Sequence, residues 1–150
     1  MGTWLALQID TEKLRALNTN PKHFVDKLGH ILFNHKSCML VNRIILVGDH
    51  VNVYDFKDVV WAFVTRCRPG LDEHVFEDVP GFPMTPYMSH GGGEDFRRGG
   101  KAIYDALMPA EYTTGCHFQE VSFEKSYPES VREKIESNWL RWGFNPTQCR

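Results

Sequence analysis

The sequence lacks the features that would place a protein in a membrane or on nucleic acid. No stretch of the 150 residues is long and apolar enough to span a bilayer, and the start Met1-Gly2-Thr3-Trp4 has no basic segment followed by an apolar one. The net charge is only −2, so there is no basic excess that would attract nucleic acid or an anionic membrane surface. We therefore expect no nucleic-acid partner and no membrane partner.

Close cysteine pairs and metal-binding spacings are missing as well. The four cysteines, Cys38, Cys67, Cys116 and Cys149, are far apart, so none is placed to share a zinc ion or to exchange disulfides with a neighbour. The seven histidines show no His-Glu-x-x-His spacing, and a metal site made by this chain alone is not predicted. Free thiols in a reducing, cytoplasmic setting are the simplest interpretation.

A phosphate-binding loop is also absent. Gly100-Lys101 looks like the end of such a loop, but Asp95 stands where the first glycine is needed. Ala102 stands where a magnesium-binding hydroxyl belongs. The glycines in this region therefore do not predict nucleotide binding.

The composition is that of an ordinary globular protein. Apolar residues make up 42% and charged residues 24% of the chain, values that argue against disorder. A chain of this length can bury about 68–70% of its unfolded surface, enough for a real core. We predict one domain spanning residues 1–150.

Strand and helix patterns alternate along the first half of the chain and predict an α/β fold. Residues 4–9 and 44–47 are short apolar runs, and Gly48-Asp49 closes the second one. Two helices are expected between these strands, the longer one starting at Asn20-Pro21. A third helix should run from Phe56 to Arg66 and face the sheet with an apolar stripe: Phe56, Val59, Val60, Phe63 and Val64. This order predicts a small, partly parallel (mixed) sheet flanked by helices.

The second half of the chain has weaker patterns. Prolines and glycines are frequent from residue 69 to 100, which predicts a long, structured Pro/Gly-rich loop. Residues 116–123 alternate imperfectly between polar and apolar and predict a last strand. Pro128 then begins a C-terminal amphipathic helix that should end at Gly143. Its apolar stripe is Val131, Ile135, Trp139 and Trp142.

Several segments are similar in sequence to one known family. They are residues 4–10, 47–73, 76–83, 86–90, 98–101, 106–109, 111–115 and 123–128. The matching motifs include Val53-Tyr54-Asp55, Trp61-Ala62-Phe63, Thr65-Arg66-Cys67-Arg68-Pro69-Gly70 and Pro86-Tyr87-Met88-Ser89-His90. These segments resemble the C-terminal domain of the UbiD-type decarboxylases, specifically the fungal ferulic acid (phenylacrylic acid) decarboxylases. The resemblance is specific for the family and much less specific for the substrate.

The resemblance implies roles for four residues. Lys36 matches a family lysine that contacts the phosphate end of prenylated FMN, although the sequence alone favours a solvated lysine. Phe82 and Met84 match apolar walls of the pocket that grips an aromatic or alkenyl acid. Met39 stands where the family typically has a pocket-lining tyrosine.

The resemblance also implies what the chain does not contain. In the resembled enzymes prenylated FMN is the electron sink for decarboxylation, and manganese and potassium help to seat its phosphate. The Arg-Glu-Glu set that handles protons and the metal ligands belong to an earlier domain, and nothing in this chain matches them. We therefore expect no catalytic and no metal-binding residue here, and a cofactor bound mainly by a domain outside this chain.

Two functions remain open at this point. The chain can be the C-terminal part or subunit of a decarboxylase of α,β-unsaturated or aromatic acids, closing the active site and forming a homo- or heterodimer with a catalytic domain or full-length decarboxylase chain. Alternatively, it is a non-catalytic homologue that dimerises with a full-length decarboxylase and regulates or stabilises it. The family usually has further acidic residues where this chain has His50 and Asn52. The departures at Met39 and His50 from the family pattern favour the second function. In neither case should the isolated chain catalyse decarboxylation.

Overall fold

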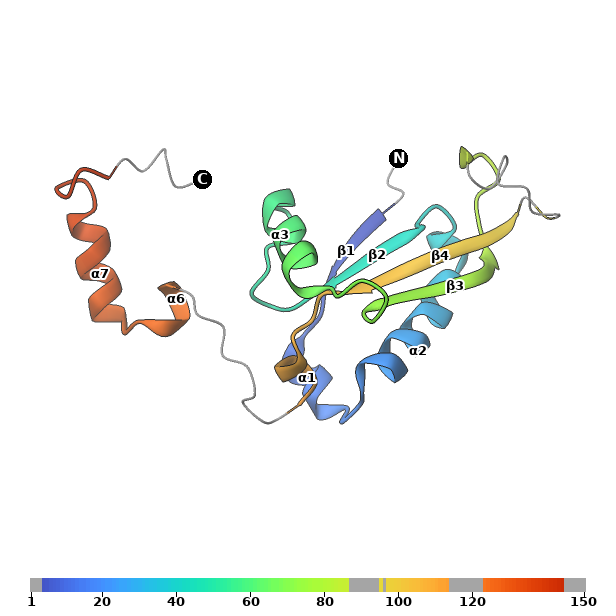
Figure 1. The fold of residues 1–150 in the computed structure, drawn as a ribbon, viewed down its shortest axis with the longest axis horizontal. Helices are drawn as coiled ribbons and strands as arrows, with labels where there is room; N and C mark the ends of the chain where they lie inside the picture. Colours follow the sequence, from blue (N-terminus) through green and yellow to red (C-terminus); the bar gives the residue numbers. More distant parts are fainter. Residues whose placement is uncertain (1–3, 87–94, 96, 114–122, 145–150) are drawn as a thin grey trace. The chain divides into compact units, whose positions relative to one another are not determined.

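The computed structural model describes residues 4–86, 95, 97–113 and 123–144. The chain divides into two compact units, Met1–His117 and Phe118–Arg150. The first unit contains a β-sheet with helices on both faces, and the second contains two short helices (Figure 1). That residues 1–150 act as one domain stays a prediction.

Four strands form one mixed sheet in the order β1-β2-β4-β3 (Figure 1). The strands are β1 (Trp4–Gln8), β2 (Arg43–Val47), β3 (Glu73–Pro80) and β4 (Arg98–Asp105). β2 is parallel to both β1 and β4, whereas β3 runs antiparallel to β4 and has an irregularity between Phe76 and Val79. The predicted mixed sheet is confirmed.

Two helices connect β1 to β2 on one side of the sheet. They are α1 (Thr11–Ala16) and α2 (Pro21–Phe33). As predicted, Asn20 is the N-cap of α2: its side chain accepts a hydrogen bond from the backbone N–H of His23 at 2.9 Å. A cap of this kind stabilises a helix by about 1 kcal/mol.

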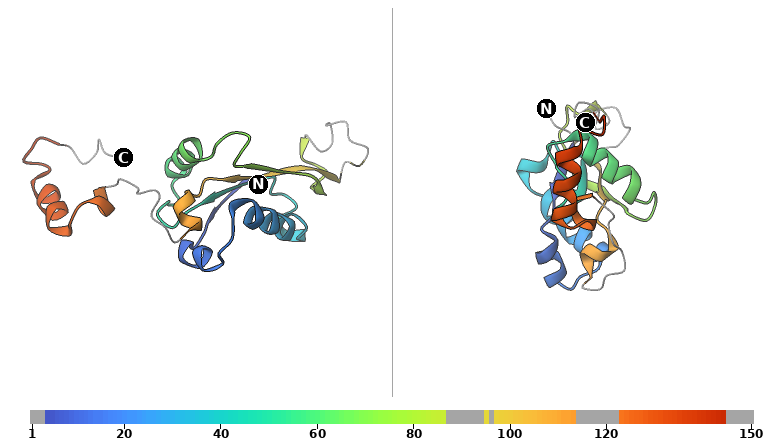
Figure 2. Two further views of the ribbon diagram at one scale, coloured as in Figure 1. Left: turned by 60° about the horizontal axis from the view of Figure 1, so that its bottom comes forward. Right: turned by 90° about the vertical axis from the view of Figure 1, so that its left-hand side faces the viewer.

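A third helix, α3 (Phe56–Arg66), covers the other face, so that α2 and α3 lie on opposite sides of the sheet (Figure 2). Val59 and Ala62 are fully buried, whereas Phe56 and Val64 are each 65% exposed. The predicted apolar stripe is therefore wrong at Phe56 and Val64. A single helix lying on a sheet buries only the residues along its line of contact, and the ends of this stripe lie beyond that line.

Each face of the sheet carries its own hydrophobic core. The core on the α2 side comprises Leu14, Val25, Phe33, Ile44, Leu46, Phe76, Val79, Ile103, Leu107 and Tyr112. The core on the α3 side comprises Val47, Val51, Val59, Ala62 and Ala106. Successive side chains of a strand point to opposite faces, so Ile44 and Leu46 join the first core while Ile45 packs against the second. This double coverage explains the continuous apolar run of β2.

The region from residue 69 to 100 is not one loop, because it contains all of β3 and the beginning of β4. β3 is an edge strand rich in charged residues, so its sequence shows neither an apolar run nor clear alternation. The connection between the two strands is the part of the predicted loop that remains. Within it the structure describes residues 81–86, 95 and 97.

Two short helical turns complete the described part of the first unit. One is η1 (Lys36–Cys38), a 3-10 turn between α2 and β2. The other is α5 (Pro109–Tyr112), which follows β4. Both lie at the ends of strands: η1 precedes β2, and α5 follows β4.

The second unit contains α6 (Phe123–Ser126) and α7 (Glu129–Asn138). Pro128 precedes α7 as predicted, but the helix ends at Asn138 and Gly143 adopts a φ of 88°. None of the residues of α7 is buried. The strand predicted at 116–123 lies outside the described residues except for Phe123, which begins α6. Throughout the described part of the chain, every helix is too short or too polar to cross a bilayer.

Candidate functional site

The candidate site lies at one end of the sheet, the end at which strands β2 and β4 begin. β3 terminates at the same end, because it runs antiparallel to β4 and Pro80 pairs with Arg98. The turn η1 leads into β2, and residues 81–86 follow β3, so both connections leave the sheet at this end (Figure 1). The sheet topology thus brings the four predicted site residues to one end of the sheet, as two pairs: Lys36 with Met39, and Phe82 with Met84.

Lys36 and Met39 lie on the same short turn. Lys36 begins η1, and Met39 is its C-cap, donating its backbone N–H to the Lys36 carbonyl at 3.3 Å. The His35 ring supports the turn, since its Nδ1 accepts a hydrogen bond from the Ser37 N–H at 3.3 Å. Lys36 is exposed, and no group among the described residues bonds to its ammonium. Its charge is therefore available to an external anion.

A buried lysine from the sheet holds this turn. Lys101, on β4, is only 2% exposed. Its Nζ donates hydrogen bonds to the carbonyl oxygens of Cys38 at 3.0 Å and Met39 at 3.2 Å. The ammonium also lies 5.3 Å from the centre of the Phe33 ring. Burial lowers the pKa of Lys101, because desolvation disfavours the charged form.

Phe82 and Met84 lie together directly after β3. Gly81 donates its N–H to the Arg97 carbonyl at 2.8 Å, and Thr85 donates to the Phe82 carbonyl at 3.0 Å, so the segment forms a tight turn. Phe82 is half-buried, whereas Met84 is 80% exposed. No hydrogen bond between described residues joins this pair to Lys36 or Met39. The structure brings the members of each pair together, and it places the two pairs at one end of the sheet without a hydrogen bond between described residues of the two pairs.

An open groove of about 310 Å³ lies over β3 and β4, beside the start of β2, and none of the four predicted site residues lines it. Its lining includes Asn42, Arg43, Val75, Gly100, Lys101 and Tyr104. Asn42 is 2% exposed, and neither its side-chain nitrogen nor its side-chain oxygen has a hydrogen-bond partner in the described part of the structure. Buried polar atoms are rarely left unpaired, so this corner of the sheet is unusual.

A second polar cluster lies at the opposite end of the sheet, where the parallel strands terminate. His50 follows β2, and its ring lies between Glu111 of α5, with 3.5 Å from Nδ1 to Oε1, and the guanidinium of Arg66. Glu111 also accepts a hydrogen bond from the Met108 N–H. Burial raises the pKa of Glu111. A Cβ added to Gly48 would lie 1.8 Å from Glu111 Oε1, so the carboxylate needs a glycine beneath it.

A buried carboxylate anchors the chain after β4. Asp105 accepts a hydrogen bond from the Tyr112 hydroxyl at 2.7 Å and from the Leu107 N–H at 2.9 Å. Burial raises the pKa of Asp105, and burial together with this carboxylate raises the pKa of Tyr112. Both groups tie α5 to the sheet. Neither is exposed to a ligand, so we assign them a structural role.

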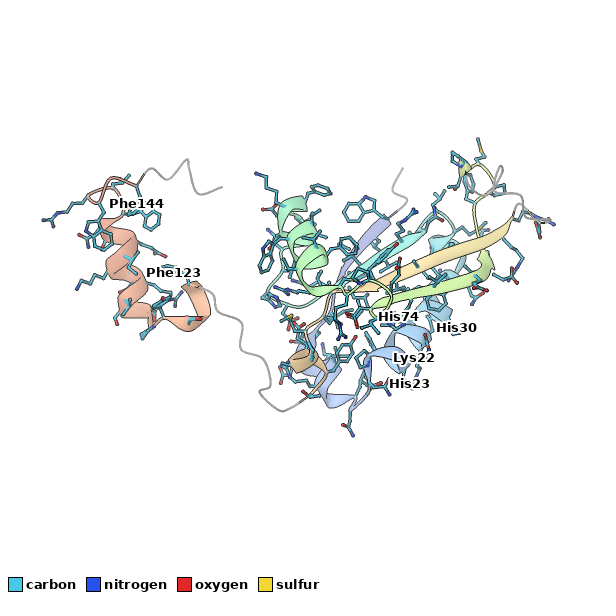
Figure 3. The ribbon with its side chains drawn as sticks, in the orientation of Figure 1. Lys22, His23, His30, His74, Phe123 and Phe144 are labelled. Carbon is cyan, nitrogen blue, oxygen red and sulfur yellow. The ribbon has the colours of Figure 1, made fainter. Side chains whose placement is uncertain are left out.

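The histidines and cysteines form no metal centre in the described part of the chain. Lys22 and His30 lie along α2, near His74 of β3 (Figure 3). Asp26 forms an ion pair with Lys22 at 2.8 Å and has His74 at 3.8 Å, while the His30 ring packs edge-on against Phe76. Burial raises the pKa of Cys67 to about 11, which leaves that thiol protonated and unreactive at neutral pH.

Comparison with known proteins identifies the class. Residues 1–106 match the family described as the 3-octaprenyl-4-hydroxybenzoate carboxy-lyase C-terminal domain. Together with the mixed sheet, this match defines a C-terminal α/β domain of a carboxy-lyase. The chain belongs to the UbiD family of decarboxylases, and it corresponds to the C-terminal domain of that family.

Similar proteins of known sequence are much longer. Ferulic acid decarboxylase 1 of Saccharomyces cerevisiae is 37% identical over 141 residues, which are 94% of this chain and 28% of that protein. Pyrrole-2-carboxylic acid decarboxylase of Pseudomonas aeruginosa is 33% identical over 143 residues, again 94% of this chain and 28% of that protein. This chain thus spans little more than a quarter of the length of these relatives.

Solved structures confirm the fold. The apo 3,4-dihydroxybenzoic acid decarboxylase of Enterobacter cloacae superposes with a TM-score of 0.60 at 20% identity, over 89% of this chain and 26% of that one. HmfF of Pelotomaculum thermopropionicum, a UbiD-class enzyme in complex with FMN, superposes with a TM-score of 0.51 at 20% identity, over 81% of this chain and 24% of that one. At this level of identity the likeness concerns the fold alone.

The described residues would supply only a small part of a binding site for a flavin phosphate. Lys36 offers one exposed cation on a turn that Lys101 holds in place. A phosphate carries about two negative charges and is usually bound by several donors, so one lysine is an incomplete site. The other ligands would have to come from outside the residues that the structure describes.

Sequence reasoning missed Lys101 and Asn42. Lys101 lies within β4, and Asn42 directly precedes β2. The alternation of Lys101 with Ile103 and Asp105 on one face of β4 is the signal that could have identified the strand and its inward-facing lysine. Nothing in the sequence around Asn42 distinguishes it from an ordinary turn residue.

Proposed function

We propose that this chain is the C-terminal part or subunit of a prenylated-FMN-dependent decarboxylase of α,β-unsaturated or aromatic carboxylic acids. The observation that carries the proposal is the match over 94% of this chain and only 28% of the yeast ferulic acid decarboxylase. The remainder of the enzyme, with its manganese and potassium, would be supplied by a catalytic domain or a full-length decarboxylase chain in the cytoplasm. This chain would close the active site and take part in dimerisation.

Within such an enzyme, Lys36 would bind the phosphate of the cofactor. Its ammonium is exposed and carries a compact charge that suits a phosphate oxygen. Prenylated FMN, when bound, supplies the electron sink that decarboxylation requires. Lys36 takes no part in that chemistry and contributes only to binding and orientation.

Met39, Phe82 and Met84 would form one wall of the substrate pocket. Apolar side chains exclude water from the ring or alkene of the acid and leave its carboxylate to polar groups elsewhere. Met84 is 80% exposed in this chain, so its apolar surface is free to be covered by a ligand or a second domain. Methionine is flexible, and two methionines in this wall predict tolerance of acids of different width.

A chimeric enzyme tests the proposal. This chain would replace the matching region of the Saccharomyces cerevisiae ferulic acid decarboxylase 1, and carbon dioxide release from cinnamic acid would be measured with prenylated FMN. We expect turnover, and we expect Lys36→Ala to weaken flavin retention about tenfold or more, because a charged hydrogen bond to phosphate contributes about 1.5–3 kcal/mol. Lys57→Ala is the matched control, since Lys57 is an exposed lysine at the other face of the sheet.

The same experiment separates the two candidate functions. If the chimera retains neither flavin nor turnover, the proposed contribution to the active site is wrong. If flavin is bound equally well by the chimera and its Lys36→Ala variant, the chain acts as a dimerising homologue that regulates or stabilises a decarboxylase. The residues that favour this second function are Met39 and His50, where the chain departs from the family pattern.

A further inference from the structure

Lys101 is a buried cation with no carboxylate beside it. Its side chain is 2% exposed, and among the described residues no acidic group forms an ion pair with it. Burying an unpaired charge is costly, and proteins retain such groups where they serve a purpose other than stability.

Two of the three ammonium protons of Lys101 bond to one turn. They go to the carbonyl oxygens of Cys38 and Met39, the last residue of η1 and its C-cap. The side chain thereby bridges β4 and the turn that carries Lys36, across more than sixty residues of sequence. Without Lys101 this turn depends on local hydrogen bonds: three from the N–H groups of Cys38, Met39 and Val41 to backbone carbonyls, and one from the Ser37 N–H to the His35 ring.

Asn42, directly before the neighbouring strand β2, lies beside Lys101. The parallel register pairs Arg43 with Ala102, so Asn42 lies across from Lys101 on the same face. Its buried amide has no hydrogen-bond partner in the described structure. Lys101 likewise has a third N–H for which the described structure provides no acceptor. The Asn42 amide and the third N–H of Lys101 are therefore buried polar groups without partners among the described residues, which is unusual in a protein core.

From this geometry we propose that Lys101 is the positioning residue for Lys36 and Met39. It fixes the turn η1 on the sheet before any ligand arrives, so that the Lys36 ammonium and the Met39 side chain are held where a cofactor phosphate and an acid would meet them. The inference rests on the proposed function and assigns this residue a role in that same site. A group that is already ordered loses less entropy on binding, so the tie raises affinity without touching the ligand.

Hydrogen exchange on the full 150-residue chain tests this inference without any ligand. Lys101→Met keeps the length and apolar contacts of the side chain but removes both hydrogen bonds. We expect the variant to melt at the same temperature or higher, because an uncompensated buried charge is replaced by an apolar group. The amides of Cys38, Met39 and Val41 should exchange about tenfold faster or more, while those of β2 and β4 are unchanged.

Two further variants complete the test. Lys101→Arg retains hydrogen-bond donors and should restore protection of the turn at least in part, whereas the exposed-site control Lys57→Met should change no amide of η1. Unchanged exchange in Lys101→Met would overturn the inference. Unfolding of that variant would also overturn it, because Lys101 would then be a support of the whole fold.

Flavin binding by the chimeric enzyme links the turn to the site. Lys101→Met should weaken flavin retention toward the level of Lys36→Ala, and the double variant should be no weaker than Lys36→Ala, because both changes act through one contact. Additive losses would contradict this. If the chimera with unchanged Lys36 and Lys101 binds no flavin, the proposed function fails, while the exchange experiment still decides whether Lys101 positions the turn.

Discussion

Buried ionisable side chains differ sharply in how the fold treats their charge. Burial raises the pKa of Asp105, which accepts hydrogen bonds from Tyr112 and from a backbone N–H. The Arg68 guanidinium and backbone N–H lower the pKa of Asp72, which lies 16% exposed. A carboxylate with a raised pKa destabilises the folded state when it ionises, whereas one with a lowered pKa stabilises it.

The variant Asp105→Asn should therefore gain stability relative to the unmodified protein as the pH rises. Between the unfolded pKa, about 3.9, and the raised folded pKa, the native state binds more protons than the unfolded state, so stability falls with increasing pH. Asparagine does not titrate and removes this fall. Urea unfolding at pH 4, 5.5 and 7 measures the difference, with Asp72→Asn as a control of opposite sign. A difference that stays constant over this range would refute the assignment.

At the scale of elements, the packing of α2 on β3 depends on one glycine. Gly29 lies in the middle of α2, where alanine would normally stabilise a helix by about 1 kcal/mol. A Cβ at this position would lie 2.1 Å from Cζ of Phe76 on β3. The Phe76 ring also packs edge-on against Phe33, 5.2 Å between ring centres, so it cannot move away freely. The helix and the edge strand approach closely because residue 29 has no side chain.

Gly29→Ala should consequently destabilise the first unit by about 1–3 kcal/mol, the usual cost of overpacking a core, despite the gain in helix propensity. Chemical unfolding measures the loss. Gly100→Ala is the matched control, since a Cβ there meets no atom within 4 Å. Adding Phe76→Leu to Gly29→Ala should recover part of the loss. An increase in stability on Gly29→Ala alone would show that the helix is not held by this contact.

The whole molecule consists of two units with very different cores. The first has a buried core on each face of its sheet, made entirely by residues before His117. In the second, no residue of α7 is buried, and Trp142 and Phe144 are each 51% exposed. Short helices without tertiary packing are marginal in water. The first unit is thus able to maintain its own structure, whereas α6 and α7 are too short to be stable on their own.

A chain ending at His117 should fold with a melting temperature within a few degrees of the full chain. Its hydrophobic cores are intact, and these supply most of the stability of a domain of this size. A peptide of residues 118–150 should show little helix by circular dichroism. Failure of the shorter chain to unfold cooperatively would mean that residues after His117 are needed to complete its cores.

The fold and the site were predictable to different degrees. The first two strands, the start of α2 and the limits of α3 follow from local signals, namely apolar runs and the caps Asn20 and Asp55. The edge strand β3 was missed because its charged residues carry no periodic signal, and the extent of the buried stripe on α3 depends on where the helix crosses the sheet. Lys36 is recognisable only through the family resemblance.

By itself, the sequence determined the membership of the family and the local elements, because caps, turns and apolar runs act between residues that are close along the chain. Only the tertiary structure decided that Lys101 supports the turn of Lys36 and that Gly29 must remain a glycine. Those contacts join residues far apart in the chain, and their energies exist only once the sheet has paired and the helices have packed on it.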